Sequence, residues 1–168
     1  MNLWIKRILG VLPIIGCGAG ITVIAVAWGT TPMTATNIAS FSVFGLVYFA
    51  GAIAGLMLLE GHRHAVTANF FYWLLQTVHL YSFVFSFVFW TPLNLGGWWN
   101  ISTSSIGLTA QVGSTFQFAV FNENADFALE LDVLAVACCI YLFMQYRRER
   151  RVLVADSEPA PVAMPQTA

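Results

Sequence analysis

Two carboxylates, Glu130 and Asp132, lie near the start of an apolar run that covers residues 127–146. A run of about 20 residues can cross the hydrocarbon core of a membrane as a helix. An acid inside such a helix is costly and usually faces a partner or a water-filled cavity. Because two residues turn a helix by about 200°, we expect Asp132 to face the interior and Glu130 to lie at the rim. A span that begins nearer Leu131 is the alternative, and it leaves both acids in water.

Another apolar run, residues 70–90, carries four polar side chains at spacings of three, three and four residues. They are Gln76, His79, Ser82 and Ser86. This spacing places them on one face of a helix, and Tyr48 of an earlier run falls at a depth similar to that of His79. We therefore expect a polar layer inside the membrane that binds a ligand or a proton. A purely structural hydrogen bond from His79 to a tyrosine or serine is the alternative.

The sequence lacks the patterns that usually carry catalytic or cofactor chemistry. It contains no H-E-x-x-H, no G-x-S-x-G and no glycine-rich phosphate loop. A single histidine in the apolar runs is too few for bis-histidine haem, and His62 with His64 is too few for a structural metal site, which normally needs four ligands. The three cysteines form no C-x-x-C pair. We therefore predict no catalytic residue, no metal and no cofactor.

The composition indicates a membrane protein. Of the 168 residues, 58% are hydrophobic and 9% are charged, whereas soluble domains have roughly 25% charged residues. A net charge of −1, with no Lys/Arg cluster interleaved with aromatic residues, argues against binding nucleic acid. The four longest apolar runs are residues 8–28, 38–59, 70–90 and 127–146. Because irregular backbone cannot face lipid, we predict an all-α integral membrane protein, a bundle of four transmembrane helices.

The basic residues predict the orientation of these four spans. All seven Lys and Arg side chains fall before the first run, between the second and third, or after the fourth, and loops 29–37 and 91–126 have none. The positive-inside rule therefore predicts a multi-pass protein of the cytoplasmic (inner) membrane with both termini in the cytoplasm. As an alternative, residues 1–27 resemble a secretory signal that ends in Ala25-Val-Ala27, although their apolar part exceeds the usual 7–15 residues.

The long outer loop, residues 91–126, is expected to form a cap between the third and fourth helices, because 36 residues without structure are rare in a compact protein. Alternating apolar residues occur twice within it. They are Ile106, Leu108, Ala110 and Val112, followed by Phe116, Phe118 and Val120. A three-residue turn at 113–115 would gather both sets on one buried face, which predicts a β-hairpin. An amphipathic, re-entrant helix over 106–121 is the alternative.

These features predict a transmembrane domain over residues 1–151 and a disordered cytoplasmic tail over 152–168, which is rich in Pro and Ala. The leading functional hypothesis is a non-enzymatic accessory or partner-binding subunit that contacts the lipid bilayer and either a protein partner or a second copy. A small proton-linked transporter or channel that uses Asp132 and His79 is the second hypothesis. A membrane-embedded enzyme acting on a lipid or a quinone is the third.

Overall fold

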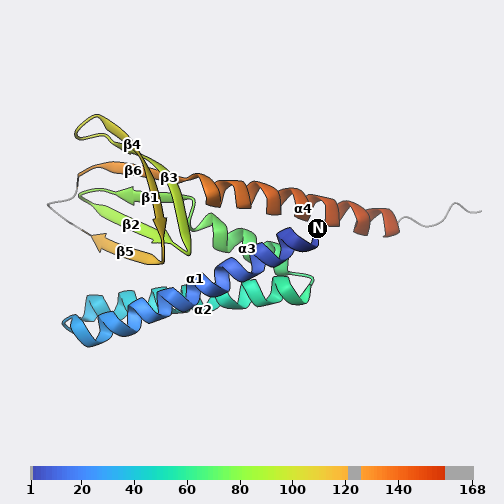
Figure 1. Cartoon of the computed structure of the whole chain (residues 1–168), viewed down its shortest axis with the longest axis horizontal. Helices are drawn as coiled ribbons and strands as arrows, with labels where there is room; N and C mark the ends of the chain where they lie inside the picture. Colours follow the sequence, from blue (N-terminus) through green and yellow to red (C-terminus); the bar gives the residue numbers. More distant parts are fainter. Residues whose placement is uncertain (1, 121–125, 158–168) are drawn as a thin grey trace, which may run out of the picture.

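The computed structural model describes residues 2–120 and 126–157, which form four helices and six strands. The helices are α1 (Leu3–Thr30), α2 (Ala35–Glu60), α3 (Ala65–Leu74) and α4 (Val133–Ser157). The strands are β1 (Val78–Tyr81), β2 (Phe85–Trp90), β3 (Leu93–Asn100), β4 (Ser105–Val112), β5 (Thr115–Val120) and β6 (Ala128–Asp132). The strands gather at one end of the molecule, beside α1 and α2, and α4 runs from the sheet toward the other end (Figure 1).

The helices α1 and α2 form a long antiparallel pair. Asn2 caps α1 by accepting a hydrogen bond from the Trp4 amide, and Thr34 caps α2 in the same way. Gly61, in the left-handed region with φ of 80°, ends α2. Within the described residues, these two helices alone are long and apolar enough to cross a membrane. They contain the first two predicted spans, residues 8–28 and 38–59.

The prediction of a bundle of four transmembrane helices is wrong. In the run 70–90, α3 ends at Leu74 and the run continues as β1 and β2. The run 127–146 begins with β6, and α4 starts only at Val133. The reason is that an apolar run does not by itself distinguish helix from strand. Residues 78–90 are rich in aromatic and β-branched residues, which favour strands. At its other end α4 continues to Ser157, inside the predicted tail, while residues 158–168 lie outside the described part.

The six strands form one antiparallel sheet in the order β4-β3-β6-β1-β2-β5. The alternating residues of the outer loop do form strands, β4 and β5, but the predicted β-hairpin between them is wrong. β4 pairs with β3, from Leu93 opposite Val112 to Asn100 opposite Ser105, and β5 pairs with β2. These two edge strands are nevertheless joined by Gly113 and Ser114 alone, so the sheet must curl until their adjoining ends meet.

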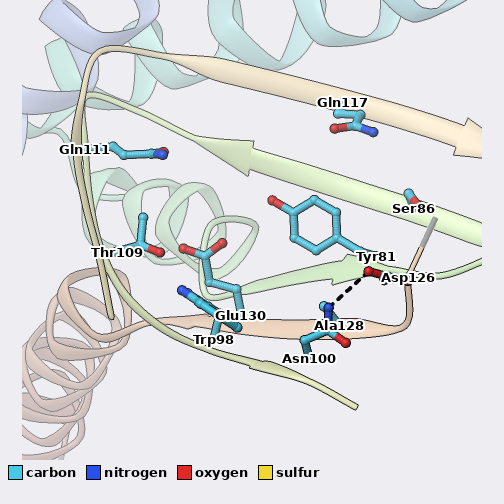
Figure 2. A pocket seen from close by; sticks show the side chains of 10 residues that line it. All are labelled: Tyr81, Ser86, Trp98, Asn100, Thr109, Gln111, Gln117, Asp126, Ala128 and Glu130. Atoms are coloured by element: carbon cyan, nitrogen blue, oxygen red, sulfur yellow. Dashed lines mark hydrogen bonds between the residues drawn. The ribbon is translucent and has the colours of Figure 1, made fainter. Parts of the chain in front are cut away.

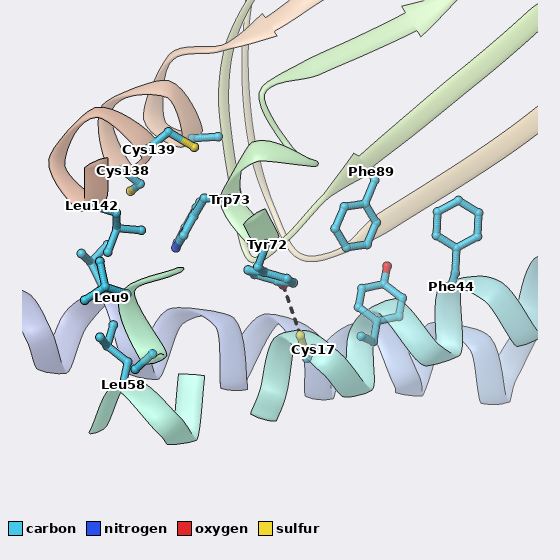
Figure 3. Packing of buried hydrophobic residues seen from close by; sticks show 14 residues of the cluster. Leu9, Cys17, Phe44, Leu58, Tyr72, Trp73, Phe89, Cys138, Cys139 and Leu142 are labelled. Carbon is cyan, nitrogen blue, oxygen red and sulfur yellow. Dashed lines mark hydrogen bonds between the residues drawn. The ribbon is translucent and has the colours of Figure 1, made fainter. Parts of the chain in front are cut away.

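A buried apolar cluster connects the helical pair to α3, α4 and β2 (Figure 3). The rings of Tyr72 and Trp73 lie at its centre, and the Tyr72 hydroxyl is 3.1 Å from the Cys17 sulfur. Gly51 of α2 makes room for the Tyr72 ring, which a side chain at that position would meet. Residues 1–27, the alternative signal segment, form most of α1, so their removal would take Cys17 out of this cluster.

The sheet is fastened to α1 near the middle of that helix. The Ser114 hydroxyl donates a hydrogen bond of 2.7 Å to the Gly16 carbonyl oxygen. A side chain at Gly16 would also meet Thr91 and Pro92, which join β2 to β3. From this point the sheet lies along the C-terminal half of α1 and the N-terminal half of α2. There Phe116 of β5 packs on Phe44 of α2, with ring centroids 4.6 Å apart.

Candidate binding site

Polar and apolar side chains alternate along the strands, and the polar ones share the inner, concave face. Successive side chains of a strand point to opposite faces, so a curled sheet can separate the two kinds completely. The inner residues surround an open pocket of about 430 Å³. They are Tyr81 of β1, Ser86 of β2, Trp98 and Asn100 of β3, Thr109 and Gln111 of β4, Gln117 of β5, Ala128 and Glu130 of β6, and Asp126 just before β6 (Figure 2).

Glu130 projects into this pocket from β6 and is held on two sides. Its Oε1 accepts a hydrogen bond of 2.7 Å from the side-chain amide of Asn94, and its Oε2 lies 3.5 Å from His79 Nδ1. His79 is opposite Glu130 in the register of β1 with β6, which explains their contact. Gly96 leaves room for the carboxylate, because a Cβ at Gly96 would lie 2.7 Å from Oε1.

His79 contacts Glu130 through one ring nitrogen and the Phe89 carbonyl through the other. The Nε2 atom of His79 is 3.1 Å from the carbonyl oxygen of Phe89, which can only accept, so Nε2 carries a hydrogen. The interaction with His79 and the Asn94 hydrogen bond lower the pKa of Glu130, and burial opposes them. These contacts favour the ionised form of Glu130.

Asp132 has a structural position rather than one in the pocket lining. Its Oδ1 accepts a hydrogen bond of 3.1 Å from the Ala135 amide, so the carboxylate caps the N-terminus of α4. The side chain is fully buried, and burial raises its pKa, while this backbone hydrogen bond opposes the rise. The other oxygen, Oδ2, has no hydrogen-bond partner within the described residues.

The expected division of the two acids is wrong, because these residues form a strand rather than a helix. In β6, residues two apart share one face, and both Glu130 and Asp132 are buried, with 5% and 0% of their surface exposed. Glu130 is therefore the acid that faces the pocket and not the rim acid. The alternative in which both acids lie in water also fails.

The predicted stripe of polar residues is divided among several elements. Ser86 lines the pocket, while Ser82 lies at the turn between β1 and β2, where its hydroxyl accepts from the Phe85 amide. Gln76, just after α3, accepts from the Thr91 amide at 2.8 Å. Tyr48 is not part of the pocket: it packs in the apolar cluster, with its ring 5.4 Å from that of Phe89.

Most of the pocket residues were missed by sequence reasoning. Trp98, Thr109, Gln111 and Gln117 occupy the positions between the apolar residues of β3, β4 and β5. The signal that could have found them is the alternation that predicted the two outer strands, because these residues alternate with the apolar ones. It was overlooked because the apolar half was assumed to face the core.

The charges of the pocket are acidic. Among its described lining residues, Glu130 and Asp126 are the charged side chains, and no Lys or Arg is present. Within the part of the chain that the structure describes, no three His, Cys, Asp or Glu side chains are placed to hold a metal ion. The chain matches no protein-family model, no curated protein sequence and no solved structure.

Proposed function

We propose that this protein is a non-enzymatic, membrane-anchored binding protein whose pocket takes a small organic cation from the outer side of a cytoplasmic membrane. The observation that carries the proposal is the polar pocket, because side chains from every strand of the sheet converge on one open cavity. A concave site with a few converging polar groups is the usual form of a small-molecule site. Its volume of about 430 Å³ suits a small ligand.

The chemistry of the lining favours a cation. The Glu130 carboxylate shares the pocket lining with the rings of Trp98 and Tyr81, and Asp126 adds a second carboxylate (Figure 2). Aromatic faces attract ammonium groups, most strongly where water is excluded. The neighbouring carboxamides of Gln111 and Gln117 can donate or accept hydrogen bonds, so they fit a ligand that also carries hydroxyl or carbonyl groups.

A binding role is better supported than transport or catalysis. Beyond Glu130 and His79, the space between the helices is occupied by the apolar cluster, in which Trp73 and Leu142 have no exposed surface. A proton-linked transporter needs a continuous polar path, which this cluster interrupts. An enzyme would need a nucleophile beside its base, and the described contacts of His79 are Glu130 and the Phe89 carbonyl.

The proposed orientation places the pocket outside. Lys6 and Arg7 lie in the first turns of α1, and Arg63 follows α2. The positive-inside rule puts these ends, and both chain termini, in the cytoplasm. A cysteine introduced at the exposed Thr103 should then react with a membrane-impermeant maleimide added to intact cells, and one at the exposed His62 should not. Reaction at His62 alone would reverse the orientation.

Binding is tested on the purified full-length protein by calorimetric titration with choline, spermidine and 3,3-dimethyl-1-butanol, a neutral analogue of choline. We expect at least one of the two cations to bind and the alcohol to bind at least about tenfold more weakly, since a desolvated cation–π contact is worth about 2 kcal/mol. Glu130→Gln should weaken binding of the cation by a similar factor. Equal binding of choline and its neutral analogue, or binding of none of the three, would overturn the proposed ligand class.

A further inference from the structure

The outer face of the sheet is as apolar as the inner face is polar. Ile106, Leu108 and Val112 of β4 are 80%, 91% and 84% exposed. The strand register extends this surface, because Trp99 of β3 lies opposite Ile106 and also opposite Leu129 of β6. The described outward positions of β3, β4 and β6 carry no charged residue. A continuous apolar surface of this kind on a soluble protein would cause aggregation or bind a partner.

The attachment of the sheet to α1 gives the depth of this surface. α1 is 28 residues long, about 42 Å at ~1.5 Å per residue, and Gly16, which Ser114 contacts, lies near its midpoint. The inner ends of β4 and β5 are therefore level with the middle of α1. The strands lead from there toward the end of α1 at Thr30, as the 6.1 Å contact of Trp28 with Phe41 and the 6.2 Å contact of Phe41 with Phe116 indicate.

We propose that the outer face of β3, β4 and β6 is embedded in the outer leaflet and is covered by lipid acyl chains. This rests on α1 and α2 crossing the membrane, which is part of the proposed function, but not on what the pocket binds. One half of a hydrocarbon core is about 15 Å thick. At about 3.4 Å per residue, Val112 lies near the bilayer centre, Leu108 is ~14 Å farther out and Ile106 is at the interface.

Two further features favour lipid over a protein partner. The apolar surface is continuous with that of α4, because Leu95, Leu108 and Val133 line one shallow groove. Trp98 and Trp99 then fall at the level of the membrane interface, where tryptophan is enriched. A protein interface usually has a polar rim around its apolar centre, whereas here the apolar side chains extend from the sheet directly onto a helix.

A sheet can enter lipid only if its backbone groups remain satisfied. Here the two edge strands are joined at their inner ends by Gly113 and Ser114, and both contribute side chains to the pocket through Gln111 and Gln117. The edges thus approach each other beside a polar cavity that can hydrate them. The sheet thus has the side-chain pattern of a small membrane barrel, apolar outside and polar inside, although no pairing joins β4 to β5 within the described residues.

The proposal is tested by spin labelling the full-length protein in vesicles of phosphatidylcholine and phosphatidylglycerol. Single cysteines are introduced at Leu108, at Leu46 on the exposed face of α2, and at Thr103 beyond the sheet, in a background with the native cysteines replaced. The measured quantity is the accessibility of each label to oxygen, which dissolves in lipid, and to a nickel chelate, which stays in water. Ala110→Cys gives a second label on β4.

We expect the label at Leu108 to show more oxygen than nickel accessibility, less strongly than the label at Leu46 because Leu108 lies nearer the interface, and the label at Thr103 to show the reverse. High nickel accessibility at Leu108, with Leu46 still in lipid, would overturn the embedding of the sheet alone. Nickel accessibility at Leu46 would instead overturn the membrane placement of α2. Low accessibility to both reagents at Leu108 and Ala110, with dipolar broadening, would identify a second copy as the occupant.

Discussion

The helical pair and the curled sheet both present apolar side chains to the outside, and they differ in what they enclose. Between α1, α2 and α3 the interior is a closely packed apolar cluster, and Gly20 and Gly51 let the rings of Tyr48 and Tyr72 approach the helix backbones. Inside the sheet the interior is a polar pocket whose buried pair is Glu130 with His79. An apolar exterior therefore does not determine the interior.

The difference follows from how each element satisfies its backbone. A helix forms its hydrogen bonds within itself, so its partner faces can be entirely apolar and pack closely. A strand forms its hydrogen bonds sideways, and its two faces are independent because side chains alternate. The curled sheet of six strands encloses an open pocket on its inner face. The inner face can then carry water or a ligand while the outer face stays apolar.

The largest effect should come from the buried pair in the sheet. Glu130→Leu removes the acceptor of the Asn94 side-chain amide and the partner of His79 in a buried polar pair, so we expect a loss of about 3–5 kcal/mol in stability. Thermal unfolding in detergent micelles measures it. The control Gln117→Leu changes an exposed pocket residue and should stay within about 0.5 kcal/mol. Equal stability of the two variants would mean that the polar interior is not structural.

A smaller effect is expected where the two regions meet. Gly16→Ala would place a Cβ against the Thr91 side chain and 2.8 Å from the Pro92 nitrogen, which cannot move without shifting the sheet, so we expect a cost of about 1–3 kcal/mol. Gly18→Ala is the matched control two residues away, since nothing lies within 4 Å of its Cβ. That variant should gain up to about 1 kcal/mol from helix propensity.

Unchanged stability of Gly16→Ala in the same thermal assay would show that the sheet is not fastened to α1 there. It would also remove the reference point for the depth of β4. A loss in both glycine variants would point instead to a general sensitivity of α1, which the open space at Gly18 argues against.

The helical pair could be predicted from the sequence, because its two apolar runs are each long enough to cross a membrane as a helix and are preceded by the capping residues Asn2 and Thr34. The sheet could not, because its pairing is non-local. β6 inserts between β1 and β3, so residues 78–81 and 93–100 both pair with a strand whose residues follow at least 28 positions later. No local sequence pattern identifies the strand with which each of them pairs. Residues 78–90 and 127–132 also fitted a helical period by chance.

The candidate site was predicted in part for the same reason. His79 and Glu130 were both selected from the sequence as ionisable groups in apolar surroundings. Their contact depends on the register of β1 with β6, which the sequence does not encode locally. The error with Asp132 came from applying a period of 3.6 residues where the period is two. Tyr48 was expected in the same polar layer as His79, but its ring packs on Phe89 in the buried apolar cluster.

The smallest expected effect is at Asp132, where the sheet passes into α4. Asp132→Ala removes the cap of α4, which costs about 1 kcal/mol, and it also removes a buried acid, which offsets part of that loss. Asp132→Asn keeps an oxygen for the Ala135 amide without the charge. We therefore expect stability at pH 7 to be highest with Asn at this position, intermediate with Asp and lowest with Ala.

The pH dependence separates the cap from the buried charge. Because burial raises the pKa of Asp132 above its ordinary value of 3.8, the cost of the charge is present above the folded-state pKa and is relieved as the pH falls through it. The advantage of Asp132→Asn over the wild type should therefore shrink on acidification and be absent below pH 3.8. Melting temperatures in detergent from pH 7 down to pH 3.5 measure this difference. An advantage that grows toward acid would mean that the carboxylate is stabilised by its surroundings, and that α4 is held to the sheet by a charge rather than by a neutral cap.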